Sequence, residues 1–182
     1  MSDFLTKEER SIRMSHIHSA DTKPERMLRK ALWRQGFRYR VNDRRLPGSP
    51  DIVLPKYRTV IFVHGCFWHG HKDCRKYSVP KTNTSFWQDK VARNQERDQE
   101  TWRKLEAKGW YVVIVWECSL EKSKISETVD TVVATIRQNG ELFLQTKENR
   151  RKVQEAYLQE RRRMKERTII LKAEISDKVS GK

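Results

Sequence analysis

Long apolar runs and cysteines are both scarce in this sequence. Its 182 residues include three cysteines, and no apolar run approaches the roughly 20 residues that a membrane-spanning helix needs. The few cysteines, together with the lack of an apolar segment near Met1, argue against an exported, disulfide-stabilised scaffold. We therefore expect a soluble protein of the reducing cytoplasm that has no membrane partner.

Acidic residues are also few relative to basic ones. Lys and Arg number 39 against 24 Asp and Glu, which gives a formal net charge of +15. Such an excess predicts a polyanionic partner, most often nucleic acid, although a ribosomal or membrane-surface protein has a similar composition. The length allows one sizeable hydrophobic core but not two ordinary domains with linkers.

The first clear element is a helix that starts near Thr22 and ends near Gly36. Thr22 offers a capping oxygen and Pro24 suits the first helical turn, while glycine favours the end. Glu25 lies in that first turn. It either completes a capping box with Thr22 or belongs to a functional site, and the sequence leaves both interpretations open.

Three short strands are expected next, at residues 37–41, 51–54 and 59–64. The first alternates apolar and polar residues, and the other two are short apolar runs separated by a break. The second and third strands should pair as an antiparallel hairpin. That pairing would bring Asp51, at the start of one strand, close to His64, at the end of the other.

A long helix at residues 85–108 is expected to precede another strand, Trp110–Cys118. This strand is continuously apolar, which is typical of a central strand covered on both faces. A further amphipathic helix begins near Ile125 and should end at Asn139 and Gly140. The order of these elements predicts an α/β fold with a mixed sheet flanked by helices.

The composition changes toward the C-terminus. Residues 147–182 contain twelve Lys or Arg against six Asp or Glu, with only a weak helical pattern of apolar residues. We expect an α/β domain at residues 1–144 and a basic, helical extension at residues 145–182. The extension could contact DNA, bind a partner or remain a solvated helix.

Side chains that bind metals crowd into residues 60–74, which read VIFVHGCFWHGHKDC. Three cysteines and one histidine have the ligand types and spacing of a structural zinc site: Cys66, His71, Cys74 and the distant Cys118. The alternative is that Cys66 and Cys118 are small buried side chains and that His71 is an exposed loop residue. The loop is too polar to be held by packing alone, which favours zinc.

Two histidines of the same stretch, His64 and His69, remain for chemistry together with Asp51 and Glu25. A carboxylate can hold Mg²⁺, a histidine can take a proton from water near neutral pH, and a basic cleft can hold a phosphate. These are the components of a phosphodiesterase.

Several motifs closely resemble those of the very short patch repair (Vsr) endonucleases. They are PD at Pro50, VIFVHGCFWHGHKDC at Val60, PKTN at Pro80, FW at Phe86, RN at Arg93, RD at Arg97 and WEC at Trp116. The resemblance covers roughly residues 3–120, and the VHGCFWHGH block is its most specific part. It implies a restriction-endonuclease-like core, related to PD-(D/E)xK nucleases, with a structural zinc. Such enzymes use Mg²⁺ and nick DNA beside a T:G mismatch.

The same resemblance implies a role for each residue that matches a motif. The catalytic residues would be Asp51, His64, His69 and Glu25, with Asp51 and the backbone carbonyl of Val63 as Mg²⁺ ligands and His69 as the general base. Zinc would be bound by Cys66, His71, Cys74 and Cys118. A wedge that enters the base stack would consist of Phe67, Trp68 and Trp87. Other DNA contacts would come from Lys81, Asn83, Lys90, Arg93 and Asn94.

Two positions depart from the usual nuclease pattern. Phe62 stands where a second acid is usual and His64 where a lysine is usual, so catalysis must depend on histidine. A homing or defence nuclease with another target, or a non-catalytic zinc module that binds DNA, are the alternatives. The resemblance implies a monomer in the bacterial cytoplasm, associated with the nucleoid, that acts on mismatched double-stranded DNA and cooperates with mismatch-repair proteins.

Overall fold

The computed structural model describes the backbone of residues 20–180 and the side chains of residues 20–164. Contacts within the chain divide it into two units, Met1–Gly140 and Glu141–Lys182. Within the described residues, no helix is long and apolar enough to cross a lipid bilayer.

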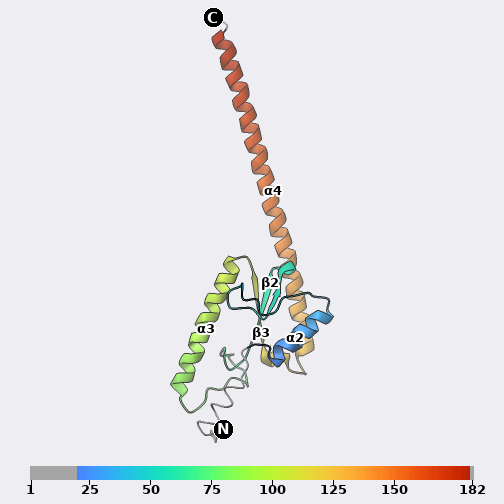
Figure 1. Ribbon diagram of the computed structural model, residues 1–182, viewed down its shortest axis with the longest axis vertical. Coiled ribbons are helices and arrows are strands. Elements are labelled where there is room, and N and C mark those ends of the chain that lie inside the picture. Colours follow the sequence, from blue (N-terminus) through green and yellow to red (C-terminus); the bar gives the residue numbers. More distant parts are fainter. Residues whose placement is uncertain (1–19, 181–182) are drawn as a thin grey trace. The chain divides into compact units, whose positions relative to one another are not determined.

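The first unit contains a three-stranded mixed sheet (Figure 1). Strand β1 (Ile52–Leu54) pairs antiparallel with β2 (Thr59–His64), and β2 pairs parallel with β3 (Tyr111–Trp116). A 3-10 turn, Pro55–Tyr57, joins β1 to β2, and a second one, Glu117–Leu120, follows β3. The predicted hairpin and the predicted mixed α/β sheet are both confirmed.

The central strand of the sheet is β2, so the prediction that residues 110–118 form the central strand is wrong. Strand β3 lies at the sheet edge. Its alternate side chains nevertheless pack into two different cores, Val113 and Val115 into one and Val112 and Ile114 into the other. A continuous apolar run therefore reports burial of both faces, which an edge strand can have when helices cover both sides of the sheet.

The predicted strand at residues 37–41 is also wrong. These residues make a single isolated bridge, Arg40 to Val53, and no strand. The alternation in this segment has another cause: Phe37 is buried in the main core, and the Tyr39 hydroxyl donates a hydrogen bond to the Arg29 carbonyl. Side chains that anchor an irregular segment can thus imitate the period of a strand.

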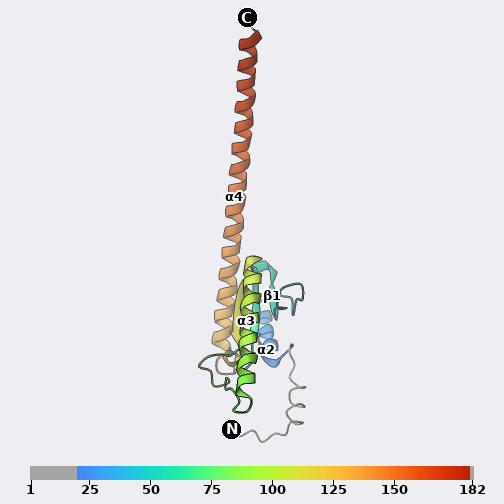
Figure 2. The same cartoon turned by 90° about the vertical axis from the view of Figure 1, so that its left-hand side faces the viewer.

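Helices cover both faces of the sheet (Figures 1 and 2). On one face, α2 (Lys23–Arg34) and the first turns of α4 (Ile125–Ser180) enclose the larger core, which includes Leu28, Ile61 and Ile136. On the other face, α3 (Thr84–Ala107) buries Leu105 against Val60 and Phe62.

Helix α4 does not end at Asn139 and Gly140, which corrects the sequence prediction. Both residues instead contact the sheet region. The amide of Asn139 is buried and donates to the hydroxyl of Thr59 at 3.2 Å. A Cβ added at Gly140 would lie 2.7 Å from the Tyr57 ring, so any larger residue would force this ring to move. These residues serve close packing rather than helix termination.

Candidate active site and metal centre

The hairpin brings Asp51 close to the C-terminal end of β2. The register pairs Ile52 with Ile61, and the Asp51 carboxylate accepts a hydrogen bond of 2.7 Å from the backbone N–H of Val63. Burial raises the pKa of Asp51 to about 6, and the nearby Glu25 carboxylate acts in the same direction. Two carboxyl groups close together, one of them largely desolvated, supply the oxygen ligands that a hard divalent cation prefers.

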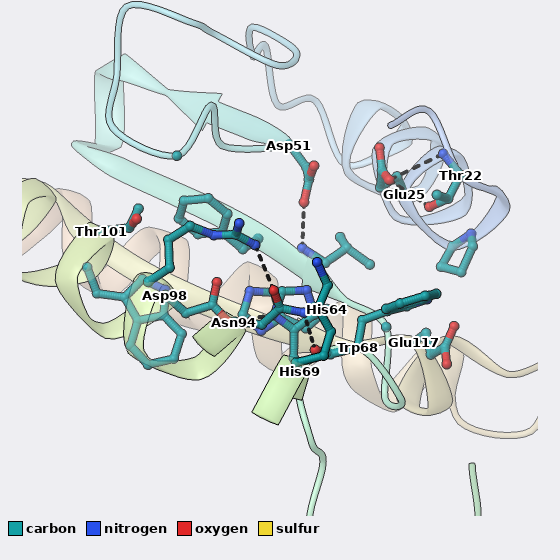
Figure 3. A pocket seen from close by; sticks show the side chains of 18 residues that line it. Thr22, Glu25, Asp51, His64, Trp68, His69, Asn94, Asp98, Thr101 and Glu117 are labelled. Carbon is teal, nitrogen blue, oxygen red and sulfur yellow. Dashed lines mark hydrogen bonds and ion pairs between the residues drawn. The ribbon is translucent and has the colours of Figure 1, made fainter. Parts of the chain in front are cut away.

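A cavity of about 690 Å³ opens beside this carboxylate (Figure 3). Its walls come from the start of α2, from β2 and the loop after it, and from one face of α3. The predicted site residues among its lining are Glu25, Asp51, Val63, His64, Trp68, His69, Lys90 and Asn94. Residues that are 69 positions apart in the sequence therefore face one space.

Glu25 has the local role that the sequence suggested and also lies in the cavity wall. It completes a capping box with Thr22 at the start of α2. Its carboxylate accepts hydrogen bonds from the backbone N–H groups of Asp21 and Thr22, at 2.9 and 3.2 Å. The Thr22 hydroxyl donates to it at 2.7 Å. These bonds fix the direction of the carboxylate beside Asp51.

His69 pairs with Asp98, a residue that the sequence reasoning did not assign to the site. The Nδ1 of His69 lies 2.5 Å from an Asp98 carboxylate oxygen. Asp98 belongs to α3 and lies four residues after Asn94, on the face of the helix that lines the cavity. The signal in the sequence was the presence of polar residues on an otherwise apolar helical stripe.

The rings of His64 and His69 stack, with centroids 3.7 Å apart and 17° between their planes. His64 is buried, and the Trp102 ring stacks over it at 5.9 Å. Burial lowers the pKa of His64 to about 4, and the neighbouring His69 contributes in the same direction. The buried Nδ1 of His64 has no hydrogen-bond partner among the described residues.

Geometrically, His64, His69 and Asp98 could share one metal ion. Two imidazole nitrogens and one carboxylate oxygen suit a transition metal better than Mg²⁺, which prefers oxygen ligands. The short bond from His69 to Asp98 is also the arrangement that orients an imidazole for proton transfer. The chemistry of these side chains thus favours a proton-transfer role for the two histidines.

The loop after β2 is fixed against α3 by hydrogen bonds to its backbone. The Asn94 amide donates to the Trp68 carbonyl at 2.8 Å, and the Gln95 amide donates to the His69 carbonyl at 3.1 Å. At Gly70, whose φ is +63°, an added Cβ would lie 2.6 Å from Gln95 and 2.7 Å from Val91. This close approach holds His69 in reach of Asp98.

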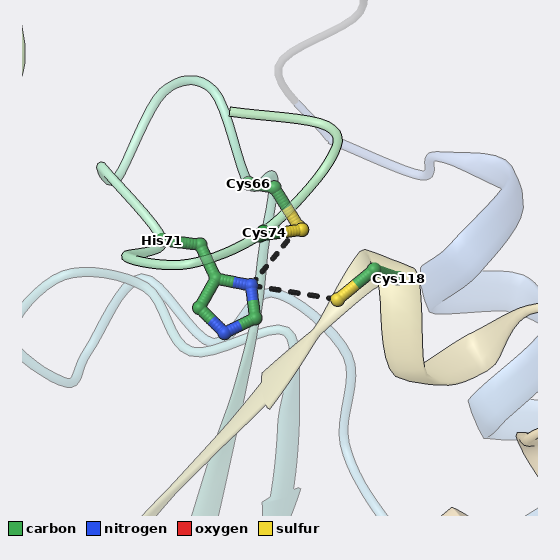
Figure 4. A group of neighbouring side chains, drawn as sticks. All are labelled: Cys66, His71, Cys74 and Cys118. Atoms are coloured by element: carbon green, nitrogen blue, oxygen red, sulfur yellow. Dashed lines mark hydrogen bonds between the residues drawn. The ribbon is translucent and has the colours of Figure 1, made fainter. Parts of the chain in front are cut away.

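A second cluster consists of residues before and after His69 in this loop together with Cys118, and it contains the four residues that were predicted to bind zinc (Figure 4). Their ligand atoms all lie within 4.8 Å of one another: Cys66, His71, Cys74 and Cys118. The His71 Nδ1 is 3.4 Å from the sulfur of Cys66 and 3.4 Å from that of Cys118. Tetrahedral zinc with its usual bond lengths would separate such ligands by about 3.6 Å, so the cluster fits this ion.

The cluster is tied to the sheet by Glu117. Its carboxylate accepts a hydrogen bond of 3.0 Å from the backbone N–H of Cys66. Glu117 directly precedes Cys118, so this bond links the backbone segments that carry two of the four cluster residues. Burial raises the pKa of the Cys66 thiol to about 12. A bound cation would reverse this effect, because a coordinated thiol is deprotonated.

The predicted wedge residues form an aromatic cluster where the loop meets the start of α3. The Phe67 ring contacts Trp68 and Trp87, with centroids 5.1 and 5.3 Å away. The neighbouring Phe86 contacts Trp87 at 5.2 Å and is 53% exposed, although the sequence reasoning gave it no role of its own.

The predicted DNA contacts fall into two groups. Lys81, Asn83, Lys90 and Arg93 are exposed at or near the start of α3, and Lys90 also lines the cavity. Asn83 is the residue before the helix and has a φ of 53°. Asn94 differs from the others because it is buried and its amide is bonded to the Trp68 carbonyl.

Comparison with known proteins relates the chain to a family of DNA-cleaving enzymes. The model of the family described as DNA mismatch endonuclease Vsr matches residues 2–76. A type II nicking enzyme of Neisseria meningitidis serogroup A is 50% identical over 138 residues, which cover 75% of this chain and 98% of that protein. The DNA mismatch endonuclease Vsr of Escherichia coli K12 is 48% identical, over 66% of this chain and 76% of that protein. A type II nicking enzyme of Xanthomonas oryzae is 45% identical, over 66% and 88% of the two chains.

The chain therefore belongs to the Vsr family of DNA mismatch endonucleases. About a quarter of its residues lie outside the match to the Neisseria protein, which is itself matched almost throughout.

Proposed function

We propose that this protein is a Mg²⁺-dependent endonuclease that nicks one strand of duplex DNA beside a T:G mismatch. The observation that carries the proposal is the contact between His69 and Asp98, in the same cavity as the desolvated Asp51. Family membership supports the activity as a DNA-nicking endonuclease. The antiparallel hairpin, followed by helix α3 and a parallel strand, supports a restriction-endonuclease-like core.

The proposed mechanism uses His69 as the general base. The Nδ1–H of His69 donates a hydrogen bond to the Asp98 carboxylate. The Nε2 of the same ring is then unprotonated and can take a proton from water. The resulting hydroxide attacks the phosphorus and one ester P–O bond breaks. The leaving oxygen departs as an alkoxide that takes a proton from water, and His69 returns its proton to the solvent. His64 is neutral at pH 7 because of its low pKa, so it can contact the phosphate or the water without adding a charge.

Asp51 and the backbone carbonyl of Val63 would hold the Mg²⁺ ion, with Glu25 next to them. When bound there, such an ion would neutralise the negative charge that develops during phosphate hydrolysis. The raised pKa of Asp51 supports this assignment, because a cation would remove the cost of ionising a buried carboxyl group. A zinc ion held by the Cys/His cluster would have a structural role.

Mismatch selection is assigned to the aromatic cluster of Phe67, Trp68 and Trp87. A wedge that separates base pairs must meet an unstacking cost of a few kcal/mol per step, and this cost is lowest at a mismatched step. Lys81, Asn83, Lys90, Arg93 and Asn94 would hold the flanking DNA. The domain boundary proposed at residues 144 and 145 and a monomeric state belong to the same proposal, as does cooperation with mismatch-repair proteins.

The proposal is tested by incubating the purified protein and Mg²⁺ with duplexes that carry either a T:G or a T:A pair within randomised flanking sequence. A nick in one strand of the T:G duplex alone is expected, and His69→Ala should abolish it. Equal nicking of both duplexes would favour a nuclease with a different target. Binding without any nick, in the wild type as in His69→Ala, would favour a non-catalytic DNA-binding module.

A further inference from the structure

The second unit is basic and consists of one helical segment. Helix α4 is continuous through Ser180, and Glu141–Lys182 forms a unit of its own (Figure 1, orange to red). Between residues 141 and 164, where side chains are described, the sequence has seven cations and four acids. The cations are Lys147, Arg150, Arg151, Lys152, Arg161, Arg162 and Arg163.

Two of the acidic residues in this segment form ion pairs with cations in its first half, Arg151 and Lys152. Arg151 pairs with Glu148 at 2.9 Å and with Glu155 at 3.8 Å, and Lys152 approaches Glu148 at 3.9 Å. No ion pair involves Arg161–Arg163 among the side chains that the structure describes, and all three are exposed. These three guanidinium groups are therefore available for an anionic partner.

The cations also repeat at a fixed interval along the helix. The triplet at residues 150–152 precedes the triplet at residues 161–163 by 11 residues, which is close to three helical turns and about 16 Å of rise. Residues that are 11 positions apart lie on nearly the same side of a helix. The two triplets thus place positive charge on the same sides of the helix at two positions along its axis.

We infer that the helix after residue 140 is a second DNA-binding surface, which contacts phosphates mainly through Arg161–Arg163, with Arg150 on the same side of the helix. The inference rests on the proposed function only in taking DNA as the polyanion, and it needs no catalysis. Exposed arginines bind phosphate oxygens in a bidentate manner, and each such contact releases counterions from the duplex. Phosphate contacts carry no sequence information, so the helix would add affinity but no mismatch preference.

A second copy of the chain is the competing partner. Val153, Tyr157 and Met164 are 70%, 60% and 58% exposed, and their spacing places them on one side of the helix. Arg150 and Arg161 border this apolar side, at three and four residues from its members. Parallel pairing of two such helices would bring like charges together along the seam, which destabilises the pair. Charge complementarity therefore favours DNA.

The test measures affinity for matched and T:G duplexes in Mg²⁺-free buffer, with the full-length protein, as a function of salt. Substitution of Arg161, Arg162 and Arg163 by Gln keeps residues that favour a helix while removing three charges. Each lost contact should flatten the slope of log affinity against log salt by about 0.9, so the triple variant should lose up to about 2.7 units. Between about 50 and 200 mM salt, the variant should then lose roughly 40-fold less affinity than the wild type, on both duplexes.

Two further variants serve as controls. Arg103→Gln, Lys104→Gln and Lys108→Gln together remove the same charge from exposed positions near the end of α3 and should change the slope less. Replacement of Arg161–Arg163 by Lys keeps the charge and should keep the slope. Circular dichroism of each variant should show unchanged helix content.

Several results would overturn the inference. They are an unchanged slope in the Gln variant, an equal change in the α3 control, a lost slope in the Lys variant or an effect confined to T:G duplexes. Sedimentation showing a dimer that Tyr157→Gln and Met164→Gln dissociate, with the salt dependence lost as well, would assign the helix to self-association. If the Gln variant flattens the salt slope as expected but the wild type never nicks T:G duplexes, the proposed function is contradicted and the assignment of the helix to DNA binding still holds.

Discussion

The imidazole of His71 lies parallel to the indole of Trp116, with ring centroids 4.1 Å apart and 2° between their planes. The same indole meets His64 edge-on at 5.5 Å. Trp116 and His64 are also register partners at the ends of the parallel strands β3 and β2. One side chain on the sheet therefore contacts both the Cys/His cluster and the stacked histidines of the cavity.

Removal of this shared contact should affect both sites. Trp116→Leu is expected to weaken metal retention by up to about tenfold, since an aromatic pair contributes about 0.5–1.5 kcal/mol beyond its area. It should also slow nicking at saturating DNA, whereas Trp116→Phe should restore most of both properties. Metal release to a chelator and single-turnover nicking measure the two effects. Trp33→Leu, at an exposed tryptophan of α2, is the control, and an equal effect there would contradict the assigned role.

The pairing of His69 with Asp98 predicts a catalytic defect without a binding defect. Asp98→Asn should lower the nicking rate by about 10²-fold or more, because the imidazole loses both its orientation and the carboxylate that stabilises its protonated form. The affinity for T:G duplexes should stay within about twofold of the wild type. Asp89→Asn, the same change at an exposed position of α3, should be silent. A similar loss in both variants would mean that charge on α3, rather than the contact with His69, limits the rate.

Asp51 should destabilise the Mg²⁺-free protein near neutral pH. Its pKa is about 6 in the folded state against 3.8 for the free side chain, so the folded state binds more protons between these values and stability falls as the pH rises from about 4 to 6. Asp51→Asn keeps an acceptor for the Val63 N–H and removes this cost. We expect it to raise the free energy of unfolding at pH 7.5 by up to about 3 kcal/mol and to abolish nicking.

The measurement for Asp51 is urea unfolding of both proteins at pH 7.5 and near pH 4 without added Mg²⁺. The difference between them should shrink toward zero at the lower pH. A variant that is less stable than the wild type at pH 7.5 would show that the carboxylate is stabilising even without a cation.

The Cys/His cluster should hold about one zinc ion per chain after dialysis against a weak chelator. Cys118→Ser should release the ion and cost at least about 3 kcal/mol of stability, which lowers Tm by roughly 6–12 °C for a chain of this size. Cys118→His, which keeps a zinc ligand, should lose less. Metal analysis and calorimetry report the two effects. Wild-type protein that is folded and free of zinc would refute the assignment.

The wedge assignment predicts a loss confined to mismatched DNA. Trp87→Ala should weaken T:G binding by about 1–3 kcal/mol, roughly the contribution of one stacked aromatic side chain, and should leave matched binding nearly unchanged. Phe86→Ala, at the exposed ring that contacts Trp87 from outside the aromatic cluster, is the matched control and should have a smaller effect. Equal losses on matched and mismatched duplexes would assign Trp87 to packing of the loop against α3.

Features set by neighbouring residues could be predicted from the sequence. The capping box of Thr22 and Glu25 closes within three positions, and the hairpin closes across a short turn, so local hydrogen bonds decide both. Three of the four ligands in the Cys/His cluster lie within nine residues, which is why their spacing alone suggested a metal. In such cases the chain has little freedom to place the residues elsewhere.

Contacts between distant segments were decided only by the tertiary structure. Asp98 meets His69 across 29 positions because α3 is held against the loop by Asn94, Gln95 and the close approach at Gly70. A helical stripe specifies which side of α3 is buried, but not which loop residue each side chain reaches. Likewise, the sequence could not show that Asn139 and Gly140 pack on the sheet region instead of ending α4. The sequence by itself determined the residues available for chemistry, and the packing of α3 determined which of them act together.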